Sequence, residues 1–352
     1  MKKILVISIT VCMILSVISG CNQDQSNEVL QGQENKVNNE NINNQEGVEN
    51  SQDEKNEFNV LADELIINED SVTFIDGMDK EVTIKKNPEK VVCLYNSYLD
   101  LWYGSGGQVI GRIESRTKVP EKAMDVEVVG SMTSPNIEKI ISMQPDLVIL
   151  RPGMRGQMEI IPILEQNEIQ YLAIEYDNFD QYLYVTRIFT ALNERDDLFV
   201  KNGLDISNKV QEIVNKAPKD KQPTVLLMFT STRNVSVKLE NTFVGDMLYD
   251  LGAKNIAYDA QLSNEEMEIF SMEKVIERDP DFILVQTMGD VDKIKDKLIK
   301  DVESNPAWGA LTAVKEGRYI FLPKDLYLYK PNARYYEAYL GLAKILYPDT
   351  FN

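Results

Sequence analysis

The apolar residues of this chain form short continuous runs between helical stretches, and one such arrangement occurs twice. In the first copy, a short amphipathic stretch around Glu138 leads to Pro145-Asp146 and an apolar run. In the second copy, a similar stretch around Glu273 leads to Pro280-Asp281 and another apolar run at the same spacing. Each copy predicts a short helix, a turn and a buried strand. We interpret the pair as an internal duplication.

A second matched pair of segments lies upstream of these units. Gly106-Gly107 and Gly252-Ala253 each follow an apolar run, 91–94 in the first half and 225–228 in the second. Helices that alternate with short buried strands are typical of a mainly parallel sheet covered on both faces. The sequence therefore predicts an α/β fold in which one Rossmann-like lobe occurs twice, with a ligand cleft between the two lobes.

The segment between the two halves has apolar residues at roughly helical spacing and contains no proline from 178 to 216. This pattern predicts one long connecting helix over 178–218, interrupted only around Asn193 and Gly203. The N-terminal lobe then covers 58–177 and the C-terminal lobe covers 219–352. Because a helical connector resists bending, we expect only modest closure on a ligand.

Two local patterns predict the ends of the folded part. Near its start, Asp76-Gly77 lies between two runs of strand-forming residues, which predicts a β-hairpin with positive φ in the turn. Near its end, the apolar spacing predicts a final helix over about 332–346.

The N-terminal residues predict export and a lipid anchor. Two lysines precede an apolar run that is too short to remain in a bilayer as a spanning helix. The small residues before Cys21 resemble the lipobox of bacterial lipoproteins, so we expect a signal peptide over 1–20 and lipidation of Cys21. Residues 21–57 are rich in Asn, Gln, Glu and Ser, which predicts a disordered tether. The expected location is the extracytoplasmic face of the cell membrane.

Charge and residue usage narrow the possible ligands. The formal net charge of −19 argues against nucleic-acid binding. Because the chain has no histidine, capture of a bare transition metal and ligation of haem by histidine are not expected, although tyrosine or methionine could ligate haem. Cys93 is the cysteine that remains after Cys12 and Cys21, so neither an intramolecular disulfide nor an iron-sulfur cluster is expected. We predict no metal site and no cofactor.

Ligands of open α/β sheets lie beyond the carboxyl ends of the strands, which indicates the candidate ligand-binding residues. These candidates are Tyr95, Tyr98, Arg151, Arg155, Arg233, Tyr329 and Arg334. Arginine forks flanked by tyrosines suit a large, planar or aromatic, anionic guest. Arg151 and Arg233 could instead form structural pairs with carboxylates, and we expect Trp102 to pack in the core.

Several motifs in order resemble the substrate-binding proteins of ABC importers for iron-siderophores, haem and cobalamin. The resemblance runs from about residue 74 to residue 351, and its motifs are 134–140 with 144–149, 271–273 with 279–281, 305–318, and 342–348. It implies two Rossmann-like lobes joined by one long helix, a ligand between them, and docking onto a permease dimer that carries a cytoplasmic ATPase. By motif position, Glu138 and Glu273 would meet arginines of the permease. Alternatively, Glu138 and Glu273 are solvated carboxylates in the first turns of helices, where the helix dipole favours negative charge.

The leading hypothesis is a lipid-anchored receptor that binds an iron complex, a ferric siderophore above all, and delivers it to a permease. Within the same class, the guest could be cobalamin, haem or an oxyanion such as molybdate. A different class is a surface adhesin or sensor without transport. No histidine, cysteine pair or nucleophile arrangement favours an enzyme.

Overall fold

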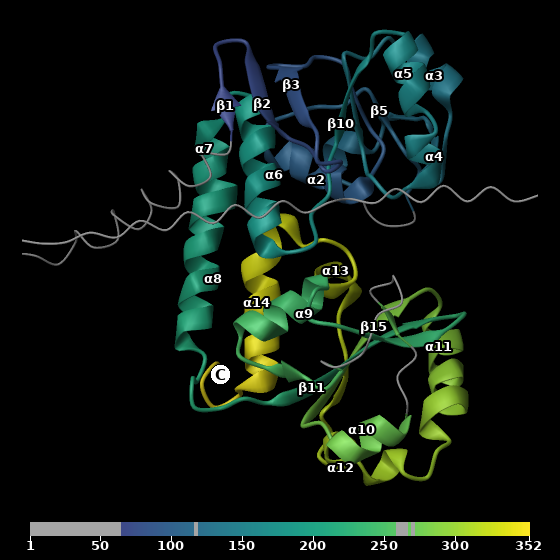
Figure 1. The fold of residues 1–352 in the computed structure, drawn as a ribbon, viewed down its shortest axis with the longest axis vertical. Helices are drawn as coiled ribbons and strands as arrows, with labels where there is room; N and C mark the ends of the chain where they lie inside the picture. Colours follow the sequence, from purple (N-terminus) through teal and green to yellow (C-terminus); the bar gives the residue numbers. More distant parts are fainter. Residues whose placement is uncertain (1–64, 116–118, 258–266, 269–271) are drawn as a thin grey trace, which may run out of the picture. The chain divides into compact units, whose positions relative to one another are not determined.

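The computed structural model describes residues 65–115, 119–257, 267–268 and 272–352 (Figure 1). The predicted signal peptide, the tether and Cys21 lie outside these residues. Within the described ranges, no helix combines the length and the apolar character that crossing a bilayer requires.

A three-stranded antiparallel sheet opens the described chain, and its strands are β1 (Ile66–Ile67), β2 (Ser71–Ile75) and β3 (Glu81–Lys85). The predicted hairpin at Asp76-Gly77 is present, but the positive φ lies at Asp79 (57°) and not at Gly77. Asp76 Oδ1 accepts two backbone N–H groups of the turn. Gly77 is required for close approach, because a Cβ there would lie 2.8 Å from the backbone nitrogen of Glu175.

The N-terminal lobe contains a five-stranded parallel sheet in the order β10-β9-β4-β5-β6. The strands are β4 (Val91–Cys93), β5 (Gly111–Arg112), β6 (Glu127–Val128), β9 (Leu147–Leu150) and β10 (Gln170–Ala173). A two-stranded ribbon of β7 (Gly130–Ser131) and β8 (Ser134–Pro135) lies apart from this sheet. The helices of the lobe are α2 (Asn96–Gly104), α3 (Ile137–Ser142), α4 (Arg155–Met158), α5 (Ile161–Gln166) and α6 (Phe179–Leu192).

The C-terminal lobe has a mixed sheet in the order β14-β12-β11-β15-β16, and β13 pairs with the start of β11. The strands are β11 (Thr224–Ser231), β12 (Val235–Lys238), β13 (Lys254–Asn255), β14 (Met267–Glu268), β15 (Phe282–Met288) and β16 (Tyr319–Phe321). The helices are α9 (Phe243–Asp250), α10 (Met272–Arg278), α11 (Val291–Leu298), α12 (Thr312–Lys315), α13 (Lys324–Tyr327) and α14 (Tyr335–Leu346). The final helix therefore matches its prediction closely.

The two sheets repeat one strand arrangement, which confirms the internal duplication. The order β10-β9-β4-β5 in the first sheet corresponds to β16-β15-β11-β13 in the second, with parallel pairing throughout. Asp146 accepts the backbone N–H groups of Glu89 and Lys90 at 2.9 and 3.0 Å. Asp281 accepts the N–H of Thr224 at 2.8 Å. Each repeated Pro-Asp unit thus ties its turn to the chain at the start of the neighbouring strand.

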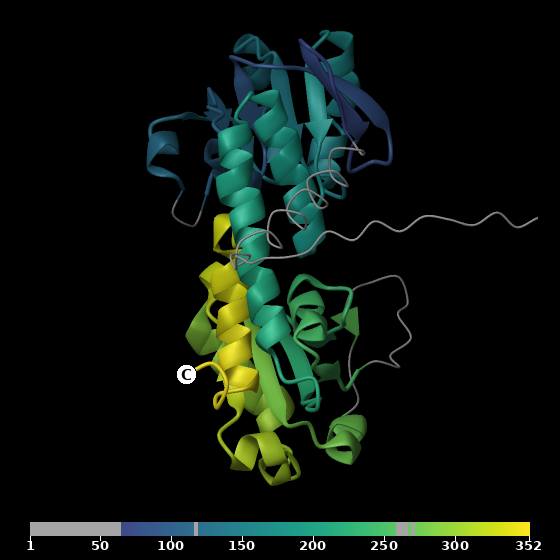
Figure 2. The same cartoon turned by 90° about the vertical axis from the view of Figure 1, so that its left-hand side faces the viewer.

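The helical connection between the lobes is present, but it is shorter than predicted. Helix α6 ends at Leu192, and the chain reverses where Glu194 adopts a φ of 51°. The connector then consists of α7 (Asp196–Phe199), the π-helical segment Val200–Leu204 and α8 (Asp205–Lys216). Helices α6 and α7 lie side by side in Figures 1 and 2. The predicted interruption near Asn193 is thus a full reversal, whereas the one near Gly203 is a wide helical turn.

Alternate residues of the central strands enter different apolar cores. Val91 of β4 and Val225 of β11 belong to one continuous cluster, which also contains residues of α2, α6, α8, α9 and α14. Val92 belongs to a second cluster within the N-terminal lobe, and Leu226 to a third within the C-terminal lobe. One apolar core therefore runs along a face of both sheets and joins the lobes.

At the border of this core, three carboxylates from two helices face one another. Asp246 and Asp250 lie on α9, and Asp180 lies in the first turn of α6. Burial, followed by the charges of Asp250 and Asp180, raises the pKa of Asp246 to about 6. Tyr339 donates a 2.6 Å hydrogen bond to Asp250. The charged form of Asp246 is therefore less favourable in the folded chain than in the unfolded chain.

Substitution of Asp246 tests this penalty. Because the folded pKa exceeds the ordinary value of 3.8, the native chain should lose stability as the pH rises from about 4 through about 6. We expect Asp246→Asn to raise the free energy of unfolding by about 1 kcal/mol at pH 8, after discounting for solvent screening, and to change nothing at pH 4. Urea unfolding at both pH values measures this. The exposed control Asp220→Asn should change neither value, and an equal gain at both pH values would contradict the assignment.

Candidate functional site

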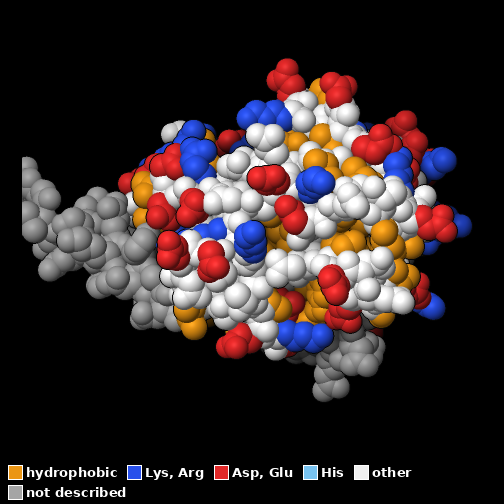
Figure 3. Space-filling model, turned by 90° about the horizontal axis from the view of Figure 1, so that it is seen from above, with side chains coloured by type: hydrophobic (Ala, Val, Ile, Leu, Met, Phe, Trp, Pro, Cys, Tyr) orange, Lys and Arg blue, Asp and Glu red, His pale blue; other side chains and the backbone are white. Residues whose placement is uncertain are grey.

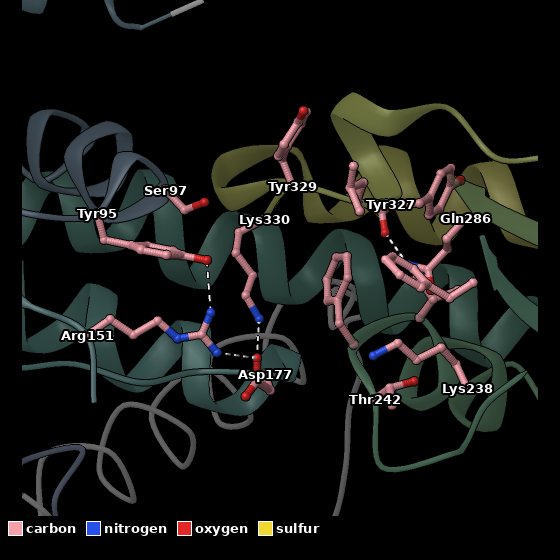
Figure 4. A pocket seen from close by; sticks show the side chains of 14 residues that line it. Tyr95, Ser97, Arg151, Asp177, Lys238, Thr242, Gln286, Tyr327, Tyr329 and Lys330 are labelled. Carbon is pink, nitrogen blue, oxygen red and sulfur yellow. Dashed lines mark hydrogen bonds and ion pairs between the residues drawn. The ribbon is translucent and has the colours of Figure 1, made fainter. Parts of the chain in front are cut away.

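A cavity of about 200 Å³ lies where the carboxyl ends of strands from both lobes meet (Figure 4). This is the position that the strand-end rule predicts. The N-terminal lobe contributes Tyr95, Arg151 and Asp177, which follow β4, β9 and β10, respectively. The C-terminal lobe contributes Lys238 at the end of β12 and Lys330 before α14. Three cationic side chains from two lobes thus reach one small space.

Arg151 is the central cation of the N-terminal lobe at this cavity. Its Nη1 donates to the Tyr95 hydroxyl oxygen at 2.9 Å, and its guanidinium carbon lies 5.1 Å from the centre of the same ring. Its Nη2 lies 3.3 Å from Glu175 Oε1 and 3.8 Å from Asp177 Oδ1. Burial alone would lower the pKa of Arg151, but Tyr95, Tyr98 and Asp177 raise it overall. The guanidinium therefore keeps its charge although it is only 19% exposed.

Gln157 fixes the loop that carries Arg151, and the sequence analysis did not identify it. This fully buried side chain accepts the backbone N–H of Arg151 at 2.8 Å through Oε1. Its Nε2 donates to the carbonyl oxygens of Leu94 and Met132 at 2.8 and 2.9 Å. Gly156 is required beside it, because a Cβ there would lie 2.0 Å from a backbone carbonyl oxygen. An amide next to a glycine on a predicted cleft loop is the signal that could have indicated this role.

Lys330 brings the charge of the C-terminal lobe to the cavity. Its Nζ lies 2.5 Å from Asp177 Oδ1 and above the rings of Tyr176 and Phe243, at 5.1 and 5.3 Å from their centres. Burial raises the pKa of Asp177, but Lys330, Arg151 and Lys238 outweigh that effect and lower it overall. The carboxylate of Asp177 is therefore ionised and accepts from a cation of the other lobe.

Asn332 fixes the segment around Lys330 against the N-terminal lobe. Its Oδ1 accepts the hydroxyl of Tyr176 at 2.6 Å. Its Nδ2 donates to the carbonyl oxygen of Ser97 at 3.0 Å and to Asp100 at 2.8 Å. The residue has a φ of 51°, a left-handed conformation that asparagine tolerates better than most residues. The loop of the C-terminal lobe that carries Lys330 is thus held at the cavity by directional contacts.

The structure brings three of the seven candidate ligand residues together at the cavity, namely Tyr95, Arg151 and Tyr329. Tyr98 does not line it, because it lies one helical turn further along α2 and points into the core. Its hydroxyl donates to the carbonyl oxygen of Ile174 at 2.6 Å, and the side chain is 1% exposed. Trp102 is fully buried in the core, as expected.

The other three candidate arginines lie elsewhere. Arg155 is 92% exposed and pairs with Glu159 at 2.8 Å. Arg334 pairs with Asp325 at 3.0 Å and with Glu337 at 2.8 Å. Arg233 lines a separate hollow beside β12.

Asp177 and Lys238 line the cavity and were absent from the predicted set. Asp177 follows β10, so the strand-end rule could have found it. Lys238 ends β12, which pairs antiparallel with β11, and no parallel-sheet pattern indicates that strand.

Glu138 and Glu273 are both exposed, and each lies in the first turn of a short helix, α3 or α10. Asn136 caps α3 by accepting the N–H of Lys139 at 3.0 Å. The two glutamates occupy corresponding places in the duplicated lobes, and their docking role stays a prediction. Acidic and basic side chains are interspersed over the face of the chain drawn in Figure 3.

Comparisons with known proteins identify the family. A family described as "Periplasmic binding protein" matches residues 91–326. The uncharacterized ABC transporter substrate-binding lipoprotein YvrC of Bacillus subtilis (strain 168) is 30% identical over 287 residues, which cover 80% of this chain and 87% of that protein. The Fe(3+)-citrate-binding protein YfmC of the same strain is 23% identical, with coverage of 92% and 90%.

A solved structure supports the same fold. The S. aureus IsdE structure complexed with heme is similar with a TM-score of 0.63 at 19% identity, over 73% of this chain and 98% of that one. The two-lobed α/β fold with a helical connector is shared with it. The chain therefore belongs to the periplasmic binding protein family, as a non-enzymatic, substrate-binding component of ABC transport.

Proposed function

We propose that this chain captures an anionic iron chelate, a ferric siderophore above all, in the cavity between its lobes and delivers it to an ABC permease. The observation that carries the proposal is the convergence of Arg151, Lys238 and Lys330 on one space beside Tyr95. Guanidinium and ammonium groups supply the donors that negatively charged chelate oxygens need, and the tyrosine ring supplies contact area. The relative named as an Fe(3+)-citrate-binding protein supports an iron chelate as the guest.

The size of the cavity favours a guest that is only partly enclosed. Its volume of about 200 Å³ is below the range of roughly 300–1,000 Å³ that is usual for enclosed sites of drug-sized ligands. A chelate can place its anionic edge among the cations and leave the rest near solvent. Haem would have to bury a large apolar ring here, and because the chain has no histidine, a tyrosine or methionine would have to hold its iron.

The proposal includes an anchored position outside the cytoplasm. Lipidation at Cys21 would hold the chain at the membrane, and the tether over 21–57 would let the lobes reach the permease. Glu138 and Glu273 would meet cationic residues of the permease, one from each lobe. Exposed ion pairs contribute about 0.2–1 kcal/mol each, so we expect them to control orientation and association rate more than affinity.

The ligand assignment is tested by titrating the intrinsic fluorescence of the chain with a ferric catecholate, a ferric hydroxamate, ferric citrate, haemin and cobalamin. We expect a ferric chelate to quench the signal with saturation. Arg151→Ala should weaken that binding by about 10-fold or more, because charged hydrogen bonds contribute about 1.5–3 kcal/mol. The control Arg155→Ala removes an exposed arginine outside the cavity and should bind like the native chain. Saturable binding of only cobalamin or an oxyanion would contradict the proposal.

The docking role is tested by reversing both charges, Glu138→Lys with Glu273→Lys, in cells that depend on the importer. We expect chelate uptake to be lost while the affinity of the purified chain stays unchanged, because both residues are exposed and absent from the cavity lining. Glu277→Lys, on the same helix as Glu273, is the matched control and should support normal uptake. Native uptake by the double variant would refute docking through these residues.

A further inference from the structure

Among the described residues that line the cavity, Asp177 is the one anion, beside the cations Arg151, Lys238 and Lys330. A single oxygen, Oδ1, lies 2.5 Å from Lys330 Nζ and 3.8 Å from Arg151 Nη2. Glu175 Oε1 lies 3.3 Å from the same Nη2 of Arg151. Two of the three cations, Arg151 and Lys330, thus already hold carboxylates of the protein, and Asp177 is the carboxylate that contacts both.

The backbone of Asp177 is fixed, whereas its carboxylate borders the cavity. Its N–H donates to Gln181 Oε1 at 2.6 Å, and the next residue, Asn178, caps α6 by accepting the N–H of Gln181 at 2.9 Å. The side chain is nevertheless 35% exposed. A change of side-chain rotamer can therefore move the carboxylate away from Lys330 without disturbing the helix.

The ion pair between Lys330 and Asp177 is largely buried on the lysine side. The side chain of Lys330 is 11% exposed and lies between the rings of Tyr176 and Phe243. Separating a largely buried ion pair forfeits its attraction, which low exposure strengthens. A neutral guest that displaced Asp177 would forfeit this attraction without replacing it. A guest with its own negatively charged oxygen would replace one ion pair with another.

We propose that Asp177 determines the specificity of the cavity, as an internal anion that the guest's own negatively charged oxygen must displace from Lys330. The inference rests on the proposed binding role of the cavity and adds the class of guest, namely polyanionic chelates with a carboxylate-type or phenolate-type oxygen that is exposed at their edge. Guests without such an oxygen are rejected. The price of this selectivity is weaker binding of every anion.

The ionisation of Asp177 is consistent with this role. Burial raises its pKa, but Lys330, Arg151 and Lys238 lower it overall, below the ordinary value. The competing charge is therefore present throughout the neutral range. A guest cannot avoid the competition through protonation of Asp177 near pH 7.

The test compares Asp177→Asn with the native chain by calorimetric titration of metal-free citrate and of ferric citrate. Loss of the internal competitor should tighten citrate binding by about 10-fold, which corresponds to 1.4 kcal/mol. Asp177→Glu keeps the charge and should tighten citrate binding less than Asp177→Asn does, so the effect of charge is separated from that of shape. Asp325→Asn removes a carboxylate that pairs with Arg334 outside the cavity and should also behave like the native chain.

The outcomes separate this inference from the proposed function. If Asp177→Asn binds citrate no more tightly than the native chain, or if Asp325→Asn gains equally, Asp177 is not the competitor. Addition of Lys330→Met to Asp177→Asn should remove the gain, and persistence of the gain would also overturn the inference. A different result would contradict the proposed function, namely that the native chain binds none of the ferric chelates. The comparison of citrate binding between the Asp177 variants and the native chain would remain valid in that case.

Discussion

The shared apolar core is the constraint on which the arrangement of the lobes depends. Helices α6, α8, α9 and α14 contribute to one cluster that receives residues from a face of each sheet. At the junction, the ring of Tyr335 lies 5.0 Å from Phe179 and 4.8 Å from Tyr182. Burial of each large apolar side chain contributes about 1.5–3 kcal/mol, so wide separation of the lobes would expose too much of this surface. The shared core therefore favours the expectation of modest closure on a ligand.

Buried tyrosine hydroxyls give this junction its direction. Tyr176 donates to Asn332, Tyr335 to the carbonyl oxygen of Asn178, and Tyr339 to Asp250. Burial raises the pKa of each of these tyrosines, so all three remain neutral donors. Apolar contact alone would permit several lobe positions, because it has no preferred direction. The hydrogen bonds of Tyr176 and Tyr335 cross between the lobes and select one of these positions, and that selection places Lys330 opposite Arg151.

The repeated Pro-Asp units and the strand-end rule made the fold and part of the cavity predictable from sequence. Tyr95 and Arg151 were found because their place depends only on the ends of their strands. The extent of the connector was not predicted correctly. Glu194 reverses the chain without a glycine or proline, while helical periodicity continues on both sides. Tyr98 was misplaced because the rotation of α2 against its sheet depends on packing. Lys238 depends on an antiparallel strand that only tertiary pairing reveals.

The π-helical segment Val200–Leu204 determines which side of the connector helix faces the core after it. Such a wide turn contains one residue more than a regular turn, which rotates everything after it by about 100°. Upstream, the guanidinium carbon of Arg187 on α6 lies over the ring of Phe199, 5.2 Å from the ring centre. Downstream, Ile206 and Val210 enter the common core. Deletion of a single residue here would rotate α8 and turn Ile206 and Val210 toward solvent. The packing of one connector helix against both lobes therefore depends on the number of residues it contains.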